Sequence, residues 1–388
     1  MRKVAILTGS RGDYSIYSSV LDAIDKRRDI EYKLIVTGMH LSNRFGYTID
    51  EIKKDSRKIG QEVPMLKYAD TLAGMAKNTG LGIIGITEAI EKIKPDVVLV
   101  LGDRGEQLAG AVAGAHMNIP VAHLHGGEVS GTIDESIRHA ITKFAHIHLV
   151  ATKKSRERLI RLGERQEDIY LVGAPGVDGA KKKAKMNRVE TARYFNFYPK
   201  QTMVLAVQHP VTTEFVLAQQ NMEAVVSALI ELSKQTVWIY PNSDAGHTKM
   251  IAMLKSRIKK AGKERIIKIH ESLPHEAYLS LMKHAAFIIG NSSSGIIEAP
   301  SCGTAYILVG TRQAGREKAA SILEVGYDKR EILKAARKVL NDKRFMHTAK
   351  HCVKPYDPFG DANAGERVAR VLATFNIKPE LLQKRITY

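Results

Sequence analysis

Cysteine is nearly absent from this sequence, and long apolar runs are absent altogether. Its 388 residues include two cysteines, Cys302 and Cys352, which lie far apart in the chain. This excludes a disulfide framework and zinc sites built from cysteine. No apolar run approaches the roughly 18–20 residues that a membrane span needs, and the apolar stretch Val4–Leu7 is too short for a signal peptide. We therefore expect a cytoplasmic protein with no membrane partner.

Aromatic residues are also scarce, at 6% of the chain, whereas 26% of the residues are charged. The 59 basic residues exceed the 41 acidic ones, so the formal net charge is +18. Basic residues are spread along the chain, with one dense cluster at Lys181–Lys183 and Lys185. Because no basic stripe is interleaved with aromatics and no recognition motif is present, we expect no nucleic-acid partner. A generally basic surface or a phosphorylated substrate accounts for the charge better.

Short apolar runs alternate with amphipathic, helix-sized segments over most of the chain. This alternation predicts an α/β fold in which helices cover both faces of parallel sheets. The predicted strands are Val4–Leu7, Tyr32–Thr37, Val97–Leu101, Pro120–Leu124, Ile147–Val150, Ile169–Val172, Met203–Val207, Val237–Tyr240, Ile266–Ile269, Phe287–Ile289 and Ala305–Leu308. The predicted helices are Tyr14–Arg27, Leu72–Ile93, Glu106–His116, Ile133–Phe144, Ser155–Leu162, Met222–Leu232, His247–Lys260, Pro274–Lys283, Gly295–Pro300, Arg330–Leu340 and Ala364–Phe375.

The alternation stops at Pro175–Glu190, a segment rich in glycine and lysine that we predict to be a linker. We therefore expect two doubly wound, Rossmann-like domains, residues 1–178 and 190–388, that face a central cleft. Ligands of such sheets bind beyond the carboxyl ends of the strands, so the cleft is the expected site. The last predicted helix, Ala364–Phe375, is a candidate for crossing back to the first domain.

Two turns in the first half carry charged residues directly after a strand. In Gly9-Ser10-Arg11-Gly12-Asp13, the glycines and the helix start would admit an anionic ligand beside Arg11 and Asp13, although a plain turn is the alternative. The second turn contains Asp103 and Arg104. Asp103 could be a general base, bind a sugar hydroxyl or cap the next helix. The spacing Gly-x-Gly-x-x-Gly is absent, so no dinucleotide cofactor is expected.

The densest group of reactive side chains follows the predicted strand Pro120–Leu124. It contains His125, Glu128, Asp134 and Arg138. Histidine, carboxylates and arginine gathered at one strand end indicate acid/base chemistry. Asp134 and Arg138 are spaced i, i+4 on one helical face, so a surface ion pair between them is the alternative. Metal-ligand spacing such as His-Glu-x-x-His is absent, so we expect no metal.

The strand ends of the second half carry groups suited to a nucleotide diphosphate. The serine-rich turn Gly290–Gly295 could bind an anion through its hydroxyls, its backbone N–H groups and the positive end of a helix dipole. The alternative is that its serines only cap the helix. A carboxylate one turn further on could bind a ribose diol. The candidates are His209, Asn242, Asp244, Asn291, Ser292, Ser293, Ser294, Glu298 and Arg312.

In this order and spacing the motifs resemble the hydrolysing UDP-N-acetylglucosamine 2-epimerases, a branch of a superfamily with the two-domain GT-B fold. The turns Gly-Ser-Arg-Gly-Asp and His-Leu-His-Gly-Gly favour that branch, because non-hydrolysing relatives typically carry Gly-Thr-Arg-Pro-Glu and His-Val-Glu-Ala-Gly there. The matching segments are Gly9–Tyr14, Val36–His40, Gly102–Arg104, His125–Glu128, Ile137–Lys143, Gly290–Gly295 and Gly310–Gln313.

The resemblance implies an enzyme of sialic-acid-type sugar biosynthesis that converts UDP-GlcNAc and water into N-acetylmannosamine and UDP. It implies elimination of UDP to a 2-acetamidoglucal, hydration of that intermediate, no cofactor, and a homodimer. Asp103 is then the expected base, and Asp134 or the pair His125 and Glu128 the expected proton donor. Many members carry a catalytic glutamate where this chain has His125, so His125 or Glu128 would take that role here.

The resemblance also implies roles for the remaining candidates. Arg138 would orient Asp134 or reach the substrate, and Glu298 would bind the ribose. The diphosphate would be held by Arg11, His209, Ser292, Ser293 and Arg312. Histidine at position 125 is also compatible with a relative that acts on a UDP-linked 2,4-diacetamido-6-deoxy sugar. Three further functions compete with these two: a non-hydrolysing epimerase, a glycosyltransferase of the same fold and a nucleic-acid-binding protein.

Overall fold

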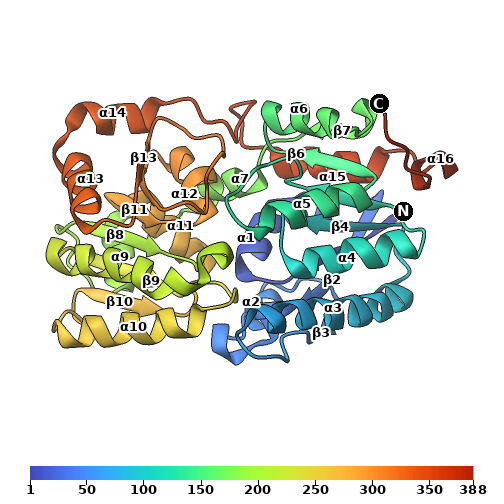
Figure 1. Cartoon of the computed structure of the whole chain (residues 1–388). Helices are drawn as coiled ribbons and strands as arrows, with labels where there is room; N and C mark the ends of the chain where they lie inside the picture. Colours follow the sequence, from blue (N-terminus) through green and yellow to red (C-terminus); the bar gives the residue numbers. More distant parts are fainter. Residues whose placement is uncertain (388) are drawn as a thin grey trace.

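The structure, a computed structural model, describes residues 1–387 as two parallel sheets that lie side by side (Figure 1). The N-terminal sheet has the strand order β3-β2-β1-β4-β5-β6-β7, and the C-terminal sheet has the order β10-β9-β8-β11-β12-β13. Both orders reverse between the first and fourth strand, as in doubly wound nucleotide-binding sheets. The predicted fold class is therefore confirmed.

The elements have the following bounds. The strands are β1 (Arg2–Thr8), β2 (Ile30–Thr37), β3 (Ile59–Val63), β4 (Val97–Leu101), β5 (Val121–Leu124), β6 (Ile147–Val150), β7 (Ile169–Leu171), β8 (Met203–Val207), β9 (Gln235–Ile239), β10 (Ile267–His270), β11 (Phe287–Gly290), β12 (Ala305–Val309) and β13 (Ile322–Val325). The α-helices are α1 (Arg11–Asp25), α2 (Ile49–Lys54), α3 (Leu72–Ile93), α4 (Gly105–His116), α5 (Ile133–Phe144), α6 (Lys153–Arg161), α7 (Pro175–Lys182), α8 (Arg188–Tyr194), α9 (Ala218–Leu232), α10 (His247–Lys260), α11 (His275–His284), α12 (Ser293–Ile297), α13 (Lys329–Asn341), α14 (Lys343–His351), α15 (Ala364–Thr374) and α16 (Pro379–Leu382).

Helices cover both faces of each sheet, because strands such as β4 and β8 are apolar at every position and must be buried on both sides. On the N-terminal sheet, α1 and α15 pack against one face and α3, α4 and α5 against the other. On the C-terminal sheet, α9, α10 and α13 cover one face and α7, α8 and α11 the other. This layering leaves the carboxyl ends of the strands free to form a site.

The helix α15 joins the end of the chain to the N-terminal sheet (Figure 1). Both carboxylate oxygens of Asp178 cap this helix, accepting from the backbone N–H groups of Ala364 at 3.1 Å and Gly365 at 2.8 Å. A Cβ at Gly365 would lie 2.5 Å from the carbonyl oxygen of Ser19, so glycine is required for α15 to approach α1 this closely. We propose domains near residues 1–178 and 190–388, with α15 completing the first.

The segment Pro175–Glu190, which we predict to be a linker, has regular structure. Residues of this segment form α7 and the start of α8, and α7 is buried from Pro175 to Ala180. Its glycines serve close packing rather than flexibility: a Cβ at Gly176 would lie 2.5 Å from the Glu298 carboxylate. The helical period is hard to read in the sequence because residues 175–180 are all buried, the polar Asp178 included, and the exposed lysines Lys181 and Lys182 come only at the end.

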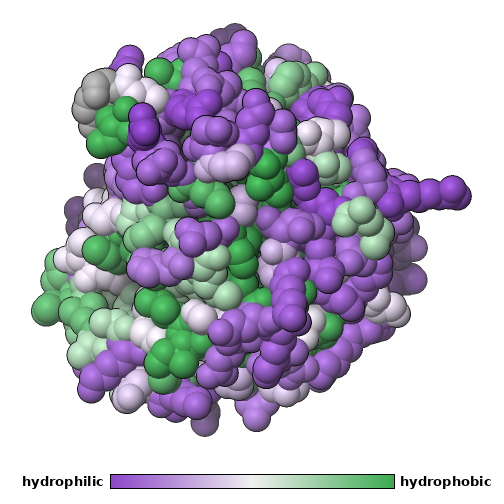
Figure 2. All heavy atoms as spheres, turned by 90° about the vertical axis from the view of Figure 1, so that its right-hand side faces the viewer, coloured by the Kyte–Doolittle hydropathy of each residue, from purple (hydrophilic) through white to green (hydrophobic). Residues whose placement is uncertain are grey.

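The molecular surface agrees with the high charge of the sequence. Hydrophilic residues cover most of the face at the N-terminal-domain end, with hydrophobic residues gathered toward the left of that view (Figure 2). No helix within residues 1–387 is both long and apolar enough to cross a membrane.

Candidate active site

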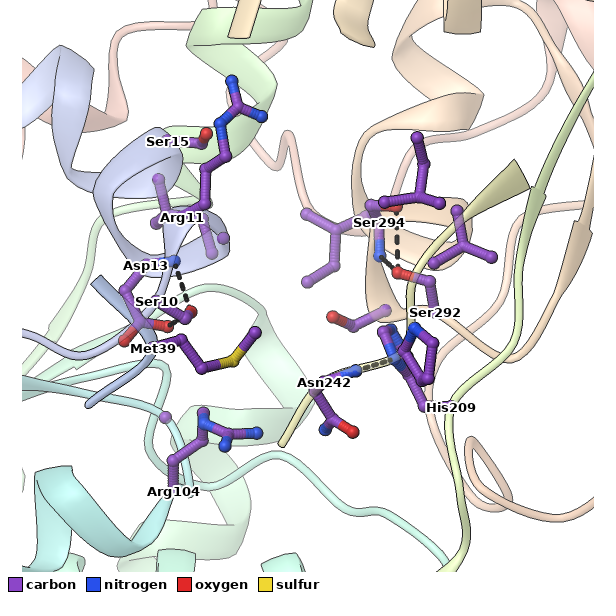
Figure 3. Close-up of a pocket in the computed structure, with 18 of the residues that line it drawn as sticks. Ser10, Arg11, Asp13, Ser15, Met39, Arg104, His209, Asn242, Ser292 and Ser294 are labelled. Atoms are coloured by element: carbon purple, nitrogen blue, oxygen red, sulfur yellow. Dashed lines mark hydrogen bonds between the residues drawn. The ribbon is translucent and has the colours of Figure 1, made fainter. Parts of the chain in front are cut away.

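A cavity of about 280 Å³ lies where the carboxyl ends of the two sheets face each other. Arg11 and Arg104 lie on the N-terminal side, opposite Asn242, His209 and Ser292 on the C-terminal side (Figure 3). Most residues predicted from the sequence line this cavity. They are Arg11, Asp13, Asp103, Arg104, His125, Glu128, Arg138, His209, Asn242, Ser292, Ser293, Ser294, Glu298 and Arg312.

The carboxylate of Asp103, in the turn after β4, forms an ion pair with Arg138 of α5. The Arg138 side chain is 1% exposed, and its Nη1 also donates to the carbonyl oxygen of Glu128 at 3.1 Å. The ion pair therefore fixes the position of the Asp103 carboxylate. An anionic carboxylate at the cavity wall is suited to act as a base.

The carboxylate of Glu128 accepts a hydrogen bond from Nδ1 of His125 at 2.5 Å. Burial by itself would raise the pKa of Glu128, but Arg316 and His125 outweigh it and hold this pKa below its ordinary value. An ionised carboxylate can only accept, so the proton of the neutral imidazole lies on Nδ1 and the lone pair on Nε2. Nε2 is buried with no partner within residues 1–387, although His125 lines the cavity. His125 can thus exchange a proton with a ligand.

The backbone at this strand exit is unusual. His125 has φ +65°, a left-handed conformation that costs free energy for a residue other than glycine. Gly127 has φ +73°, and a Cβ there would lie 2.4 Å from the carbonyl oxygen of Ser155. These two positions bend the chain so that Glu128 returns to His125. The strain is located at the side chains that we expect to carry the chemistry.

His209, in the turn after β8, is held in the opposite tautomer. Its Nδ1 accepts the backbone N–H of Asn242 at 3.0 Å, so the proton of the neutral ring lies on Nε2 (Figure 3). Burial and the nearby Arg312 and Arg104 lower the pKa of His209 well below its ordinary value. A neutral imidazole donor in the cavity wall is suited to a phosphate oxygen or another anionic group.

Several further cations and hydroxyls face the same space. The side chain of Ser292 caps α12 by accepting from the backbone N–H of Ser294 (Figure 3), and Ser294 Oγ contacts the hydroxyl of Tyr278 at 2.5 Å. Arg11 pairs with Glu51 at 2.9 Å, yet its Nη2 is buried with no partner within residues 1–387. An unpartnered guanidinium nitrogen beside a helix N-terminus is typical of an anion site.

Glu298 lies deep on the C-terminal side of the cavity. Burial raises its pKa to about 8, so the carboxyl is largely neutral at pH 7. In that form it carries both a donor and an acceptor, which suits a vicinal diol.

Some predicted ligands occupy supporting positions instead. Asp134, Asp244 and Asn291 do not line the cavity. The alternative of an ion pair between Asp134 and Arg138 is not found, because Asp134 pairs with Arg312 of the other domain at 3.2 Å. Asp244 accepts from Asn242 Nδ2 at 2.5 Å and pairs with Arg104 at 3.4 Å.

Asn291 and Asp13 likewise make contacts within the protein. The side chain of Asn291 bonds the backbone N–H of His209 at 2.7 Å and its carbonyl oxygen at 2.9 Å. Asp13 lines the cavity, but it accepts from the Gly9 backbone N–H at 3.0 Å and from Ser10 Oγ at 2.9 Å. Burial and the neighbouring Glu106 raise the pKa of Asp13 to about 6. These contacts position their neighbours.

The sequence did not single out several cavity residues as site residues, namely Ser10, Met39, Glu271, Ser272, His275 and Tyr278. Glu271 and Ser272 directly follow β10, so the rule that ligands meet strand ends could have found them. His275 and Tyr278 lie on α11 without any recognisable motif. No group of three or more His, Cys, Asp and Glu side chains within residues 1–387 is arranged to hold a metal ion.

Two facing Rossmann-like sheets, one with acid/base groups and one with anion-binding groups, define the class of two-domain nucleotide-sugar enzymes. The chain belongs to the UDP-N-acetylglucosamine 2-epimerase family, whose sequence profile matches residues 22–373. The resemblance seen in the sequence is therefore confirmed, and the family and its relatives indicate a UDP-sugar 2-epimerase.

Two curated relatives and one solved structure illustrate the match. The chain is 36% identical to the UDP-N,N'-diacetylbacillosamine 2-epimerase (hydrolyzing) of Legionella pneumophila over 388 residues, 100% of both chains. It is 35% identical to a UDP-N-acetylglucosamine 2-epimerase of Neisseria meningitidis over 346 residues, 89% of both chains. A crystal structure of a UDP-GlcNAc 2-epimerase from Neisseria meningitidis bound to UDP-GlcNAc has a TM-score of 0.79 at 18% identity, with 96% of this chain and 99% of that chain covered. At that identity the last comparison supports the fold.

Proposed function

We propose that this protein is a hydrolysing 2-epimerase that converts UDP-GlcNAc and water into UDP and N-acetylmannosamine. The observation that carries the proposal is the placement of two different proton-exchanging groups, Asp103 and His125, in one cavity with an anion-binding wall. Inversion at C2 needs a group that removes a proton and a group that returns one to the opposite face. A glycosyltransferase of the same fold could use one such group as the base for its acceptor, but it would need no group that returns a proton to C2.

In the proposed first step Asp103 removes the proton from C2 as the bond between C1 and the diphosphate oxygen breaks. The C2 proton is not acidic in the ground state, so its removal depends on positive charge developing at C1. The departing UDP carries the negative charge, which Arg11, Arg312 and the Nε2–H of His209 stabilise. UDP and a 2-acetamidoglucal are formed.

In the second step the hydroxyl of water adds to C1 and a proton is added to C2. His125 takes a proton on Nε2 from solvent, and Glu128 stabilises the resulting imidazolium through Nδ1. The imidazolium gives the Nε2 proton to C2, and the second proton of the water that adds to C1 restores it. Asp103 then releases to solvent the proton that it took from C2. In total, UDP-GlcNAc and water give N-acetylmannosamine and UDP. No residue changes oxidation state, and no cofactor is part of this scheme.

A UDP-linked 2,4-diacetamido-6-deoxy sugar is the second candidate substrate. It is favoured by the name of the Legionella pneumophila relative, which matches over the full length of both chains, and by histidine at position 125. The test is to incubate the purified protein with each UDP-sugar and to compare kcat/KM from UDP release. We expect free UDP and a free 2-epimer from UDP-GlcNAc. A preference of about tenfold or more for the diacetamido sugar would contradict the substrate assignment, and a nucleotide-linked product would contradict hydrolysis.

A further inference from the structure

Arg316 reaches from the C-terminal sheet to the acid/base groups of the N-terminal sheet. It lies in the loop between β12 and β13, and its Nη2 is 3.1 Å from Glu128 Oε2. Its Nε also donates to the carbonyl oxygen of Val129 at 3.2 Å. The two paired side chains are 8% and 2% exposed, so this is a buried ion pair between two domains. Breaking a buried pair by removing one partner is costly, because the other charge remains buried.

The ion pair is the outer end of a chain of contacts that ends at the cavity. Arg316 meets one oxygen of Glu128, and the other oxygen of Glu128 accepts from Nδ1 of His125. Building on the proposed function, we propose that Arg316 is a positioning residue that completes the acid/base pair His125–Glu128 only when the two domains are closed. Proton transfer at C2 would then depend on a residue from the domain that holds the nucleotide.

The charges around the pair support this role. Burial raises the pKa of Glu128, and the charge of Arg316 is the first of the interactions that lower it, beside the charge and the hydrogen bond of His125 and the charge of Arg158. Without the Arg316 charge, burial would raise the pKa of Glu128. The acid/base pair His125–Glu128 would then release its proton less readily. Other titratable or charged groups that act on Glu128, His125 or Arg316 are Arg138 and Asp134 on α5, Arg158 on α6, His123 on β5, Tyr306 on β12 and Tyr356 after α14. Within residues 1–387, Arg316 is the arginine or lysine at ion-pair distance from the Glu128 carboxylate.

The loops that carry Glu128 and Arg316 are packed closely, so the ion pair cannot form with the domains apart. The backbone N–H of Gly131 donates to the carbonyl oxygen of Arg312 at 3.0 Å. A Cβ at Gly131 would lie 2.2 Å from the carbonyl oxygen of Thr311. Next to Arg316, Glu317 accepts from the hydroxyl of Thr152 across the same boundary. Glu317 does not line the cavity and provides a matched control for loss of an interdomain contact alone.

The test compares the full-length wild type with R316Q, R316K and E317Q on the UDP-sugar that the wild type turns over. For each protein, kcat and KM are measured against pH, and the Kd for UDP is measured by calorimetry. R316Q is expected to lower kcat about 10- to 100-fold and to move the alkaline limb of the kcat profile, where the proton donor is lost, to higher pH. R316K keeps the charge but cannot hold two acceptors in one plane, so kcat should fall less and the limb should stay in place. E317Q should keep both kcat and the limb.

The outcomes separate the inference from the proposed function. The inference would be overturned if kcat of R316Q followed the wild type at every pH and only KM or the affinity for UDP changed. Arg316 would then be an interdomain contact without a role in proton transfer. If R316Q does not fold, an R316K protein with wild-type kcat would overturn it equally. A wild type that turns over neither UDP-sugar would instead reject the proposed function, and the inference would fall with it.

Discussion

Two histidines in one cavity are held in opposite tautomers by different partners. The Glu128 carboxylate fixes the proton of His125 on Nδ1, and the backbone N–H of Asn242 fixes that of His209 on Nε2. The first ring therefore presents a lone pair to the cavity and the second presents a donor. A hydrogen-bond partner on the far side of the ring decides whether each residue exchanges a proton or binds an anion.

At the residue scale, Asp103→Asn should abolish turnover while binding of UDP is retained. The amide has nearly the same shape but cannot take a proton from C2, so a loss of about 100-fold or more in kcat is expected. Steady-state kinetics and calorimetric titration with UDP check this. An equal loss of UDP affinity would show that Asp103 also binds or orders the nucleotide and would contradict a purely catalytic role.

Glu298 provides a prediction about stability against pH. Its pKa is about 8 in the folded protein, compared with 4.5 ordinarily. Between these values the folded state holds a proton that the unfolded chain releases, so the free energy of unfolding falls as pH rises, by up to about 1.4 kcal/mol per pH unit. E298Q should lose less stability than the wild type between about pH 5 and 8 in urea unfolding.

The control for this comparison is E88Q, which changes an exposed carboxylate on α3. Its unfolding free energy should follow the wild type at each pH. Parallel curves for E298Q and the wild type would contradict a buried neutral carboxyl at position 298.

At the element scale, the helix α10 receives its N-terminal cap from the other sheet's domain. Its own N-cap residue, Gly246, has no side chain to cap with. Asp70, in the loop before α3, accepts from the backbone N–H groups of Gly246 at 2.9 Å and Thr248 at 3.0 Å, and it pairs with His247 at 3.1 Å. These contacts outweigh burial and lower the pKa of Asp70.

Asp70→Ala should therefore cost about 0.5–2 kcal/mol of stability at neutral pH. Asp70→Asn is the matched variant, since asparagine caps nearly as well and should retain most of that stability. Because the pKa of Asp70 is lowered in the folded protein, its cap stabilises the protein fully at pH values above the ordinary pKa of aspartate. This stabilisation is lost as pH falls through the lowered pKa. Urea titrations at neutral and acidic pH check this, and a difference between D70A and the wild type that persists unchanged in acid would contradict the cap.

The elements that could be predicted from the sequence are buried either on one face or on all sides. β4, β8, α3 and α5 occupy the predicted ranges because continuous apolar runs and strong helical periods leave little choice. The edge strands β3 and β13 were missed, since they are partly exposed and have no apolar run. The helix α7 was missed because it is short and residues 175–180 are all buried, the polar Asp178 included.

The site also has parts that the sequence predicts and parts that it does not. The rule that strand ends carry ligands located the cavity walls, because each wall is local in sequence. The partners of the functional groups could not be predicted, since they join distant elements. Arg138 meets Asp103 rather than its helical neighbour Asp134, and Arg316 meets Glu128 from the other sheet.

At the scale of the whole molecule, the N-terminal core depends on the last part of the chain. Leu372 of α15 is 0% exposed and packs in the same cluster as residues of α1 and β1. Leu372→Ala should cost about 2–5 kcal/mol. Hydrogen exchange should then accelerate in β1 and α1 before it does in β8. The control is Leu333→Ala on α13, which should accelerate exchange in the C-terminal sheet instead. Uniform acceleration by both variants would contradict two separate cores.

The central claim is that UDP leaves by elimination with proton exchange at C2. It is tested most directly by proton NMR of the protein with UDP-GlcNAc in heavy water, with a chelator present. The account predicts free UDP and N-acetylmannosamine that carries deuterium at C2. Release of a sugar that keeps its original hydrogen at C2 would mean that Asp103 and His125 do not exchange that proton, and would contradict the account.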